Sequence, residues 1–177
     1  MMFKQIVIYD ANVIIDLHKI GLLPLFEQAN VQLHTTSIVT MELKNPKWDD
    51  VKLILPSLVV HSYDTFEQYV TLQSYMDSLK DRGNISMADA SVLYLAVELS
   101  APLCTGDIKL RKVAKNQGVA VQGTIGIIQQ LHKEGLINRY QAIHALRQLL
   151  ATNSYMAPEL IDEAINNLSS QPTQTIP

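Results

Sequence analysis

Acidic residues lie beside apolar segments at four separate places in this sequence. Asp10 directly follows the apolar run QIVIY, and Asp107 lies just beyond a short apolar segment that ends at Thr105. Glu42 and Asp89 lie within the first turn or two of two predicted helices. If these segments meet, the ionised carboxylates raise one another's pKa, so such a cluster normally requires a cation. Oxygen donors without a cluster of His or Cys favour Mg²⁺ or Mn²⁺.

Each carboxylate also has a purely structural interpretation. Asp89 fits a capping box with the serine three residues before it, Asp107 fits a helix N-cap, and Glu42 fits a solvated helix surface. Asp10 is the hardest to explain in this way, because a carboxylate directly after QIVIY has poor access to solvent unless it faces a cleft. Together, the four positions favour a shared site over independent structural roles.

Apolar, β-branched runs alternate along the chain with segments of helical periodicity. The predicted strands are 5–9, 31–36, 58–61, 103–105 and 119–121, and the predicted helices are 12–20, 37–43, 49–55, 64–80, 87–99, 107–116, 124–135, 139–151 and 158–168. This alternation predicts an α/β fold with a central parallel sheet and helices on both faces. Ligands gather at the carboxyl ends of the strands in such sheets, where the four carboxylates are expected. An apolar stripe that begins at Phe66 and Tyr69 is expected in the core.

Composition sets further limits. With 177 residues, 47% of them hydrophobic and 18% charged, the chain is a globular protein rather than a disordered or fibrous one. No apolar stretch reaches the roughly 18 residues of a membrane span, and the N-terminus lacks the pattern of a secretion signal. A single cysteine, Cys104, excludes an internal disulfide framework. We therefore expect a cytoplasmic protein that does not contact membranes. Asp16 lies one helical turn after Asn12, and we expect it to be exposed, with an approach to the cleft as the alternative. The histidines are expected to be structural.

Charge distribution matters more than the net charge of −3, which by itself argues against an acidic partner. Leaving out the four candidate metal ligands changes the formal balance from −3 to +1. Four basic residues directly follow Asp107 and are candidates for contacting an RNA backbone. They are Lys109, Arg111, Lys112 and Lys115. The alternative is a solvated helix face.

Neutral polar residues accompany the acidic ones. Asn12 and Thr105 lie on the strand-end loops and are suited to orienting a carboxylate, a water or a phosphate, although turn and cap roles are equally consistent. Gly123 and Thr124 begin a predicted helix whose backbone N–H groups are candidates for binding phosphate, with close packing as the alternative.

Four motifs resemble, in order, the acidic motifs of the PIN-domain family: YDANVIIDL, SIVTMEL, ISMADASVLYLA and LCTGDIKL. GTIGIIQQL is similar to a segment of the VapC-like toxin branch. The resemblance covers roughly residues 6–136 and implies a three-layer α/β/α fold with metal-dependent ribonuclease activity, often as the toxin of a toxin-antitoxin pair. It assigns catalytic roles to Asp10, Glu42, Asp89 and Asp107, and supporting roles to Asn12 and Thr105. Residues 44–84 depart from the family pattern, which leaves the choice of substrate open.

The leading hypothesis is thus a metal-dependent endoribonuclease with Mg²⁺ or Mn²⁺ as its cofactor. The alternatives are a Mg²⁺ phosphohydrolase of the haloacid-dehalogenase kind, whose DxDx[TV] motif is broken here by Asn12, and a non-catalytic PIN-like module that binds RNA or protein. Residues 1–135 are expected to form the catalytic domain, 136–169 a helical extension packed on it, and 170–177 a disordered tail. Apolar residues of the extension favour a homodimer, or an antitoxin partner.

Overall fold

The computed structural model describes residues 5–153 and 155–170. The chain divides into two compact units, Met1–Thr124 and Ile125–Pro177. Apart from Ser170, which ends the last helix, the predicted disordered tail lies outside the described residues.

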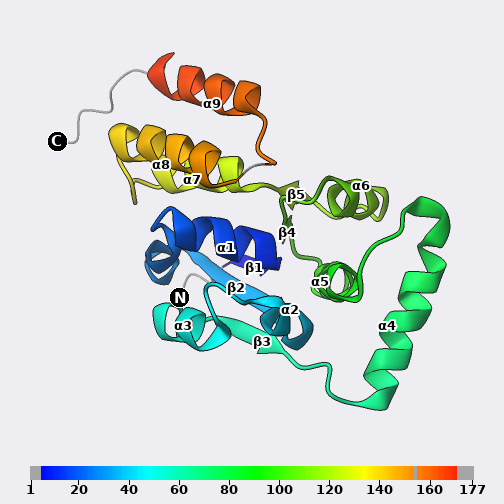
Figure 1. The fold of residues 1–177 in the computed structure, drawn as a ribbon. Coiled ribbons are helices and arrows are strands. Elements are labelled where there is room, and N and C mark those ends of the chain that lie inside the picture. Colours follow the sequence, from blue (N-terminus) through cyan, green and yellow to red (C-terminus); the bar gives the residue numbers. More distant parts are fainter. Residues whose placement is uncertain (1–4, 154, 171–177) are drawn as a thin grey trace. The chain divides into compact units, whose positions relative to one another are not determined.

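A parallel sheet forms the centre of the first unit (Figure 1). Its strands are β1 (Gln5–Tyr9), β2 (Val31–Thr36), β3 (Val59–His61), β4 (Leu103–Cys104) and β5 (Val121–Gln122). In the described part of the chain the order is β3-β2-β1-β4-β5, with every neighbouring pair parallel. Because β1 is central, its last three residues, Val7 to Tyr9, are buried, which explains the continuous apolar run.

Helices cover the two faces of this sheet, which confirms the predicted three-layer α/β/α fold. They are α1 (Ala11–Lys19), α2 (Ser37–Glu42), α3 (Trp48–Ile54), α4 (Phe66–Ser78), α5 (Met87–Glu98) and α6 (Ile108–Asn116), with short 3₁₀ turns at Leu23–Glu27 and Lys80–Arg82. After β3 the chain returns past β1 to form β4 and β5, so right-handed crossovers bring α5 to the face opposite α1 (Figure 1).

Helix α5 is the buried helix of this unit. It packs on β1 and β2, and residues on all its sides, including Val92, Leu93 and Ala96, are buried. A capping box begins the helix, in which the Ser86 hydroxyl accepts a hydrogen bond from the Asp89 N–H and the Asp89 carboxylate accepts one from the Ser86 N–H. The cap fixes where the helix starts and therefore where Asp89 lies.

Two predicted details differ from the structure. In α4, Leu72 is buried, but Phe66 is 82% and Tyr69 is 39% exposed, so the predicted core stripe is only partly correct. The reason is that α4 lies at the periphery and packs against α5, where only a narrow face is covered (Figure 1). Strand β5 lies at 121–122 rather than 119–121, although Ala120 still pairs with Leu103 through a backbone hydrogen bond.

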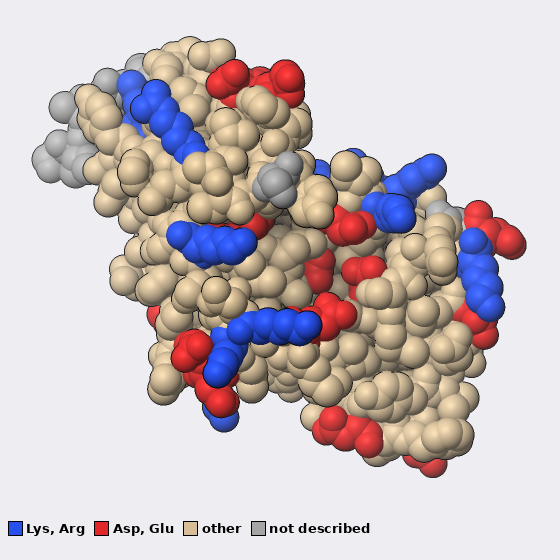
Figure 2. Space-filling model, in the orientation of Figure 1, with Lys and Arg blue, Asp and Glu red and all other residues tan. Residues whose placement is uncertain are grey.

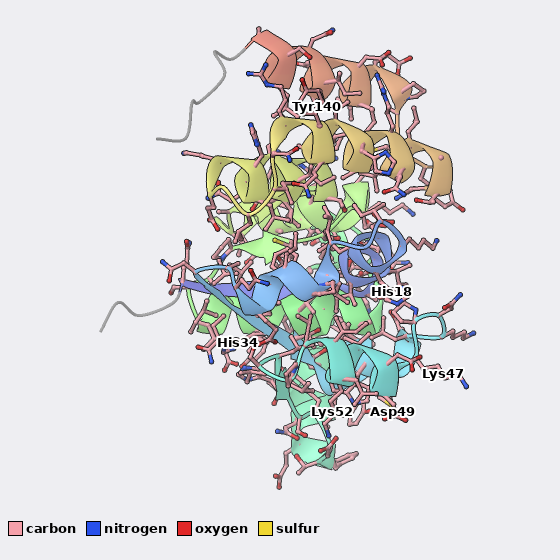
Figure 3. All side chains as sticks on the ribbon, turned by 90° about the vertical axis from the view of Figure 1, so that its left-hand side faces the viewer. His18, His34, Lys47, Asp49, Lys52 and Tyr140 are labelled. Atoms are coloured by element: carbon pink, nitrogen blue, oxygen red, sulfur yellow. The ribbon has the colours of Figure 1, made fainter. Side chains whose placement is uncertain are left out.

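The second unit is helical and contains α8 (Arg139–Thr152) and α9 (Pro158–Ser170), preceded by α7 (Thr124–Lys133), whose first residue belongs to the first unit. A capping box between Asn138 and Gln141 begins α8. Helices α8 and α9 pack together and bury Leu146 and Ile161, whereas Tyr140 is 84% exposed (Figure 3). None of the described helices is both long enough and apolar enough to cross a membrane.

Candidate active site

Asp10 is a buried carboxylate at the carboxyl end of β1, where it also caps α1. Its side chain is only 4% exposed. One oxygen accepts a hydrogen bond of 2.6 Å from the Ala11 N–H, and the other accepts one of 2.7 Å from the Thr105 hydroxyl. Burial raises the pKa of Asp10 to about 7; the Thr105 hydrogen bond opposes this shift, while the charges of Asp89 and Glu42 add to it.

Glu42 and Asp89 approach the same place from two helices. Glu42 ends α2, and its pKa is raised by burial and by the nearby charge of Asp89. Figure 2 shows carboxylates gathered in a hollow that is bounded by the regions of α2, α5 and α6, with cationic side chains beside it over α6. Asp10, Glu42 and Asp89 therefore share one electrostatic environment, as their sequence positions predict.

Asp107 is linked to Asp10 through Thr105. The fully buried Thr105 hydroxyl donates to Asp10 and accepts a hydrogen bond of 3.1 Å from the Asp107 N–H. The side-chain amide of Asn12 donates to the same hydroxyl at 3.4 Å, and its carbonyl oxygen accepts a hydrogen bond of 2.9 Å from the Gly106 N–H. Asn12 and Thr105 thus tie the loop after β4 to the end of β1, so their orienting and turn-forming roles coincide.

Asp89 and Asp107 both cap helices, so the structural interpretation of each is confirmed. Asp89 accepts a hydrogen bond of 2.9 Å from the Ser86 N–H, and Asp107 accepts one of 2.7 Å from the Leu110 N–H. Each bond occupies one carboxylate oxygen. Within the described residues, the second oxygen of each makes no hydrogen bond, which leaves it free for a ligand.

The donor chemistry of this site fits a hard divalent cation. The four acidic side chains offer only oxygen donors, and a cation would offset the charge repulsion that adds to the effect of burial on the pKa of Asp10 and Glu42. In the observed side-chain positions, no group of three or more His, Cys, Asp or Glu residues in the described chain is arranged to hold a metal ion. The chemistry of the site therefore fits, but its ligand geometry is incomplete.

The four basic residues of α6 differ in how far their side chains are exposed. Lys109, Lys112 and Lys115 are exposed, which matches their solvated-face interpretation without testing RNA contact. Arg111 is half-buried, and its guanidinium lies against Gly123 directly after β5. Gly123 is therefore closely packed.

Several polar residues that support the site were not apparent from the sequence. The Thr36 and Ser91 hydroxyls lie 2.8 Å apart in the core and join the start of α2 to α5. Asp16, expected to be exposed, is 5% exposed and accepts a hydrogen bond of 3.1 Å from the Thr124 hydroxyl. The only signals in the sequence were a serine within an apolar helix and an aspartate among apolar neighbours.

A histidine pair lies outside the acidic site. The Nδ1 atom of His34 on β2 lies 2.8 Å from Nε2 of His61 on β3 (His34 is labelled in Figure 3). Burial lowers the pKa of both rings, and for His34 the charge of His61 adds to this effect. Nε2 of His34 is buried without a hydrogen-bond partner among the described atoms, so a proton there would have no acceptor. The lowered pKa values favour neutral rings, and the structural role expected for these histidines stays a prediction.

Comparison with known proteins identifies the family. A family profile described as PIN domain matches residues 6–170, which includes every acidic residue of the site and extends through α9. No curated protein matches the sequence. The matched region also contains the parallel sheet, Asn12 and Thr105. The chain therefore belongs to the PIN-domain family.

Proposed function

We propose that this protein is a metal-dependent endoribonuclease that hydrolyses phosphodiester bonds in RNA. PIN domains are typically nucleases, which supports a hydrolase acting on nucleic acids. The observation that carries the proposal is Asp10, a buried carboxylate whose pKa of about 7 reflects burial and the charges of Asp89 and Glu42. The protein keeps this unfavourable charge cluster at the edge of the sheet where α/β proteins bind ligands.

The carboxylates have distinct proposed roles. Asp10 and Asp107 are the ligands of one Mg²⁺ or Mn²⁺ ion, and Glu42 and Asp89 complete its shell through water or hold a second ion. When bound, such an ion supplies activated water and stabilises charge on the phosphate oxygens. Thr105 supports this role because its hydroxyl fixes one oxygen of Asp10, while Asn12 holds the loop that carries Asp107.

RNA is the proposed substrate, and α6 is the element proposed to follow its backbone. Lys109, Lys112 and Lys115 are exposed on the helix that directly follows Asp107. Figure 2 shows cationic side chains over α6 beside the acidic hollow. Their positive charge offsets the repulsion between the carboxylates and a polyanion.

Metal-dependent RNA cleavage tests the proposal. Purified protein is expected to cut a labelled single-stranded RNA with Mg²⁺ or Mn²⁺ and to lose this activity in EDTA. D10N and D107N are expected to abolish cleavage while remaining folded, since each removes a charge with little change in size. D49N, on the exposed surface of α3 (Figure 3), is the matched control and should cleave normally. Undiminished cleavage in EDTA, or by both site variants, would show that the assignment is wrong.

The proposed partners are a second copy of the chain and an antitoxin protein. In support, Tyr140 on α8 is 84% exposed and Leu160 on α9 is 52% exposed, so the helical unit presents apolar side chains to solvent. A toxin role further requires a neighbouring gene that encodes a small protein with a basic, DNA-binding N-terminus. Coexpression of that protein should suppress RNA cleavage.

A further inference from the structure

The guanidinium of Arg111 lies in the space that the missing side chain of Gly123 leaves open. This space beside Gly123 is called the seat of Arg111 below. A Cβ atom built on Gly123 would lie 2.6 Å from Nη1 of Arg111 and 3.8 Å from its Cζ. Contacts below about 3 Å are not tolerated, so any side chain at position 123 would push the guanidinium away. Lys109, Lys112 and Lys115 on the same helix are exposed, whereas Arg111 is half-buried.

The seat lies at the same edge of the sheet as the acidic residues. Strands β4 and β5 pair in parallel with Cys104 opposite Gln122, and the Thr105 N–H donates to the Gln122 carbonyl at 3.0 Å. This register places Gly123 beside Thr105, whose carbonyl oxygen is 3.8 Å from the same Cβ position. Thr105 also holds Asp10. Thr105 therefore adjoins Gly123 through its backbone and contacts the Asp10 carboxylate through its hydroxyl.

The guanidinium has no partner of its own. Among the described residues, Arg111 makes no hydrogen bond or ion pair. Thr105 and Ala11 donate to the two oxygens of Asp10, and Leu110 donates to one oxygen of Asp107. A half-buried guanidinium presents a fork of N–H donors that matches two oxygens of a carboxylate or phosphate. A guanidinium whose N–H donors have no hydrogen-bond acceptor is suited to binding an anionic ligand when it lies next to an active site.

We propose that Arg111 binds one backbone phosphate of the RNA substrate through both branches of its guanidinium, and that Gly123 is the positioning residue that holds it there. The inference rests on the proposed function and deepens it. The three lysines are point charges on flexible side chains that follow the RNA backbone. Arg111 instead fixes one phosphate relative to Asp10, and it thereby determines which phosphodiester bond reaches the acidic site. A phosphate is favoured over a protein carboxylate because the seat adjoins the acidic hollow, which needs a fixed cation to admit a polyanion.

Binding measurements test the seat directly. The full-length chain carrying D10N, which prevents cleavage, is titrated with a fluorescein-labelled single-stranded RNA of random sequence, and anisotropy is followed at several salt concentrations. R111Q should weaken binding at least about tenfold and reduce the log-log salt slope by about 0.7. R111K should recover only part of the affinity, because an ammonium cannot bind bidentately. K52Q, an exposed lysine on α3 (Figure 3), is the charge-matched control and should bind normally.

The G123A variant tests the position of the Arg111 guanidinium separately from its charge. It retains Arg111 and meets only the end of a flexible side chain, so it should remain folded yet weaken RNA binding nearly as much as R111Q. Because both changes remove the same interaction, the double variant should bind no worse than R111Q alone. In the chain with Asp10 intact, R111Q should raise KM for RNA more than it lowers kcat.

Two outcomes would overturn the inference while leaving the proposed function intact. The first is normal RNA binding and KM in R111Q, which would assign the guanidinium to a protein partner or to structure. The second is additive losses from R111Q and G123A, which would show that Gly123 does not seat Arg111. Failure of the unmutated chain to cut RNA with any divalent metal would instead refute the proposed function, and the binding comparison in D10N would still decide whether Arg111 contacts RNA.

Discussion

Asp10 makes the folding free energy of the metal-free protein depend on pH. Its pKa is about 7 in the folded state but near the ordinary 3.8 when unfolded, so the folded state binds the proton more tightly. Stability is therefore expected to fall as pH rises from about 4 to about 7, because the folded protein must then hold a buried charge. The full loss is on the order of 4 kcal/mol.

Urea unfolding in EDTA checks this expectation. The difference in unfolding free energy between D10N and the unmodified chain should grow in favour of D10N from pH 5 to pH 8, and comparison at each pH cancels the contribution of His34 and His61. An unchanged difference across this range would mean that Asp10 keeps an ordinary pKa.

The acidic residues could be predicted individually because each follows a recognisable strand or helix start. Asn12 and Thr105 could be predicted with them, but other polar pairs of the core could not. Asp16 contacts Thr124 across 108 positions of sequence, and Thr36 contacts Ser91 across 55. Nothing local in the sequence marks a hydrogen bond between such distant residues. Arg111 was predicted only as one of four similar cations, because the seat at Gly123 exists only when α6 and β5 come together.

At the scale of elements, the start of α5 combines a structural and a chemical role. Ser86 and Asp89 exchange hydrogen bonds in the capping box, while Asp89 also faces the acidic cluster. D89N should retain the box, because an amide oxygen can still accept from the Ser86 N–H, yet lose the charge needed for metal-dependent cleavage. S86A should lower stability by about 1 kcal/mol and retain cleavage.

Thermal unfolding and RNA cleavage of the two variants test this separation. A D89N protein that is destabilised as much as S86A but still cleaves RNA would reverse the assignment and make Asp89 a cap alone.

The sequence predicts helices and strands best where their residues are most deeply buried. Strands β1 and β2 agree with their predicted bounds because central parallel strands require continuous apolar runs. Strand β5 has only two residues, which is too few to show an alternating pattern of apolar side chains. Its predicted position therefore differs from the observed one. In α4 the apolar spacing is genuine, but a peripheral helix need not bury all of it, and Phe66 stays exposed. The spacing of apolar residues predicts whether a segment is a helix or a strand better than it predicts how deeply the segment is buried.

At the scale of the whole molecule, the proposed homodimer depends on the helical unit. The chain passes from the first compact unit to the second between Thr124 and Ile125, whereas the domain boundary at residue 135 stays a prediction. Light scattering of the full-length chain at tens of micromolar should give twice the mass of a single chain. Y140D combined with L160D should shift the protein towards a monomer that keeps its helical circular-dichroism signal, because both side chains are exposed in the single chain.

A single mass at all accessible concentrations would contradict the dimer. It would mean that these side chains are isolated surface residues, or that they serve a different partner.

The hydrogen bond between Thr105 and Asp10 spans 95 positions of the chain, and this separation has a consequence during translation. At roughly 5 to 20 residues per second, Asp10 leaves the ribosome many seconds before its partner is synthesised. Strands β1 and β2 can pair early, but β4, Asp107 and the seat for Arg111 all arrive in the later part of the chain. A nascent chain therefore carries an incomplete centre while it is attached to a particle made largely of RNA, and the site is completed only after β4, α6 and β5 have been synthesised.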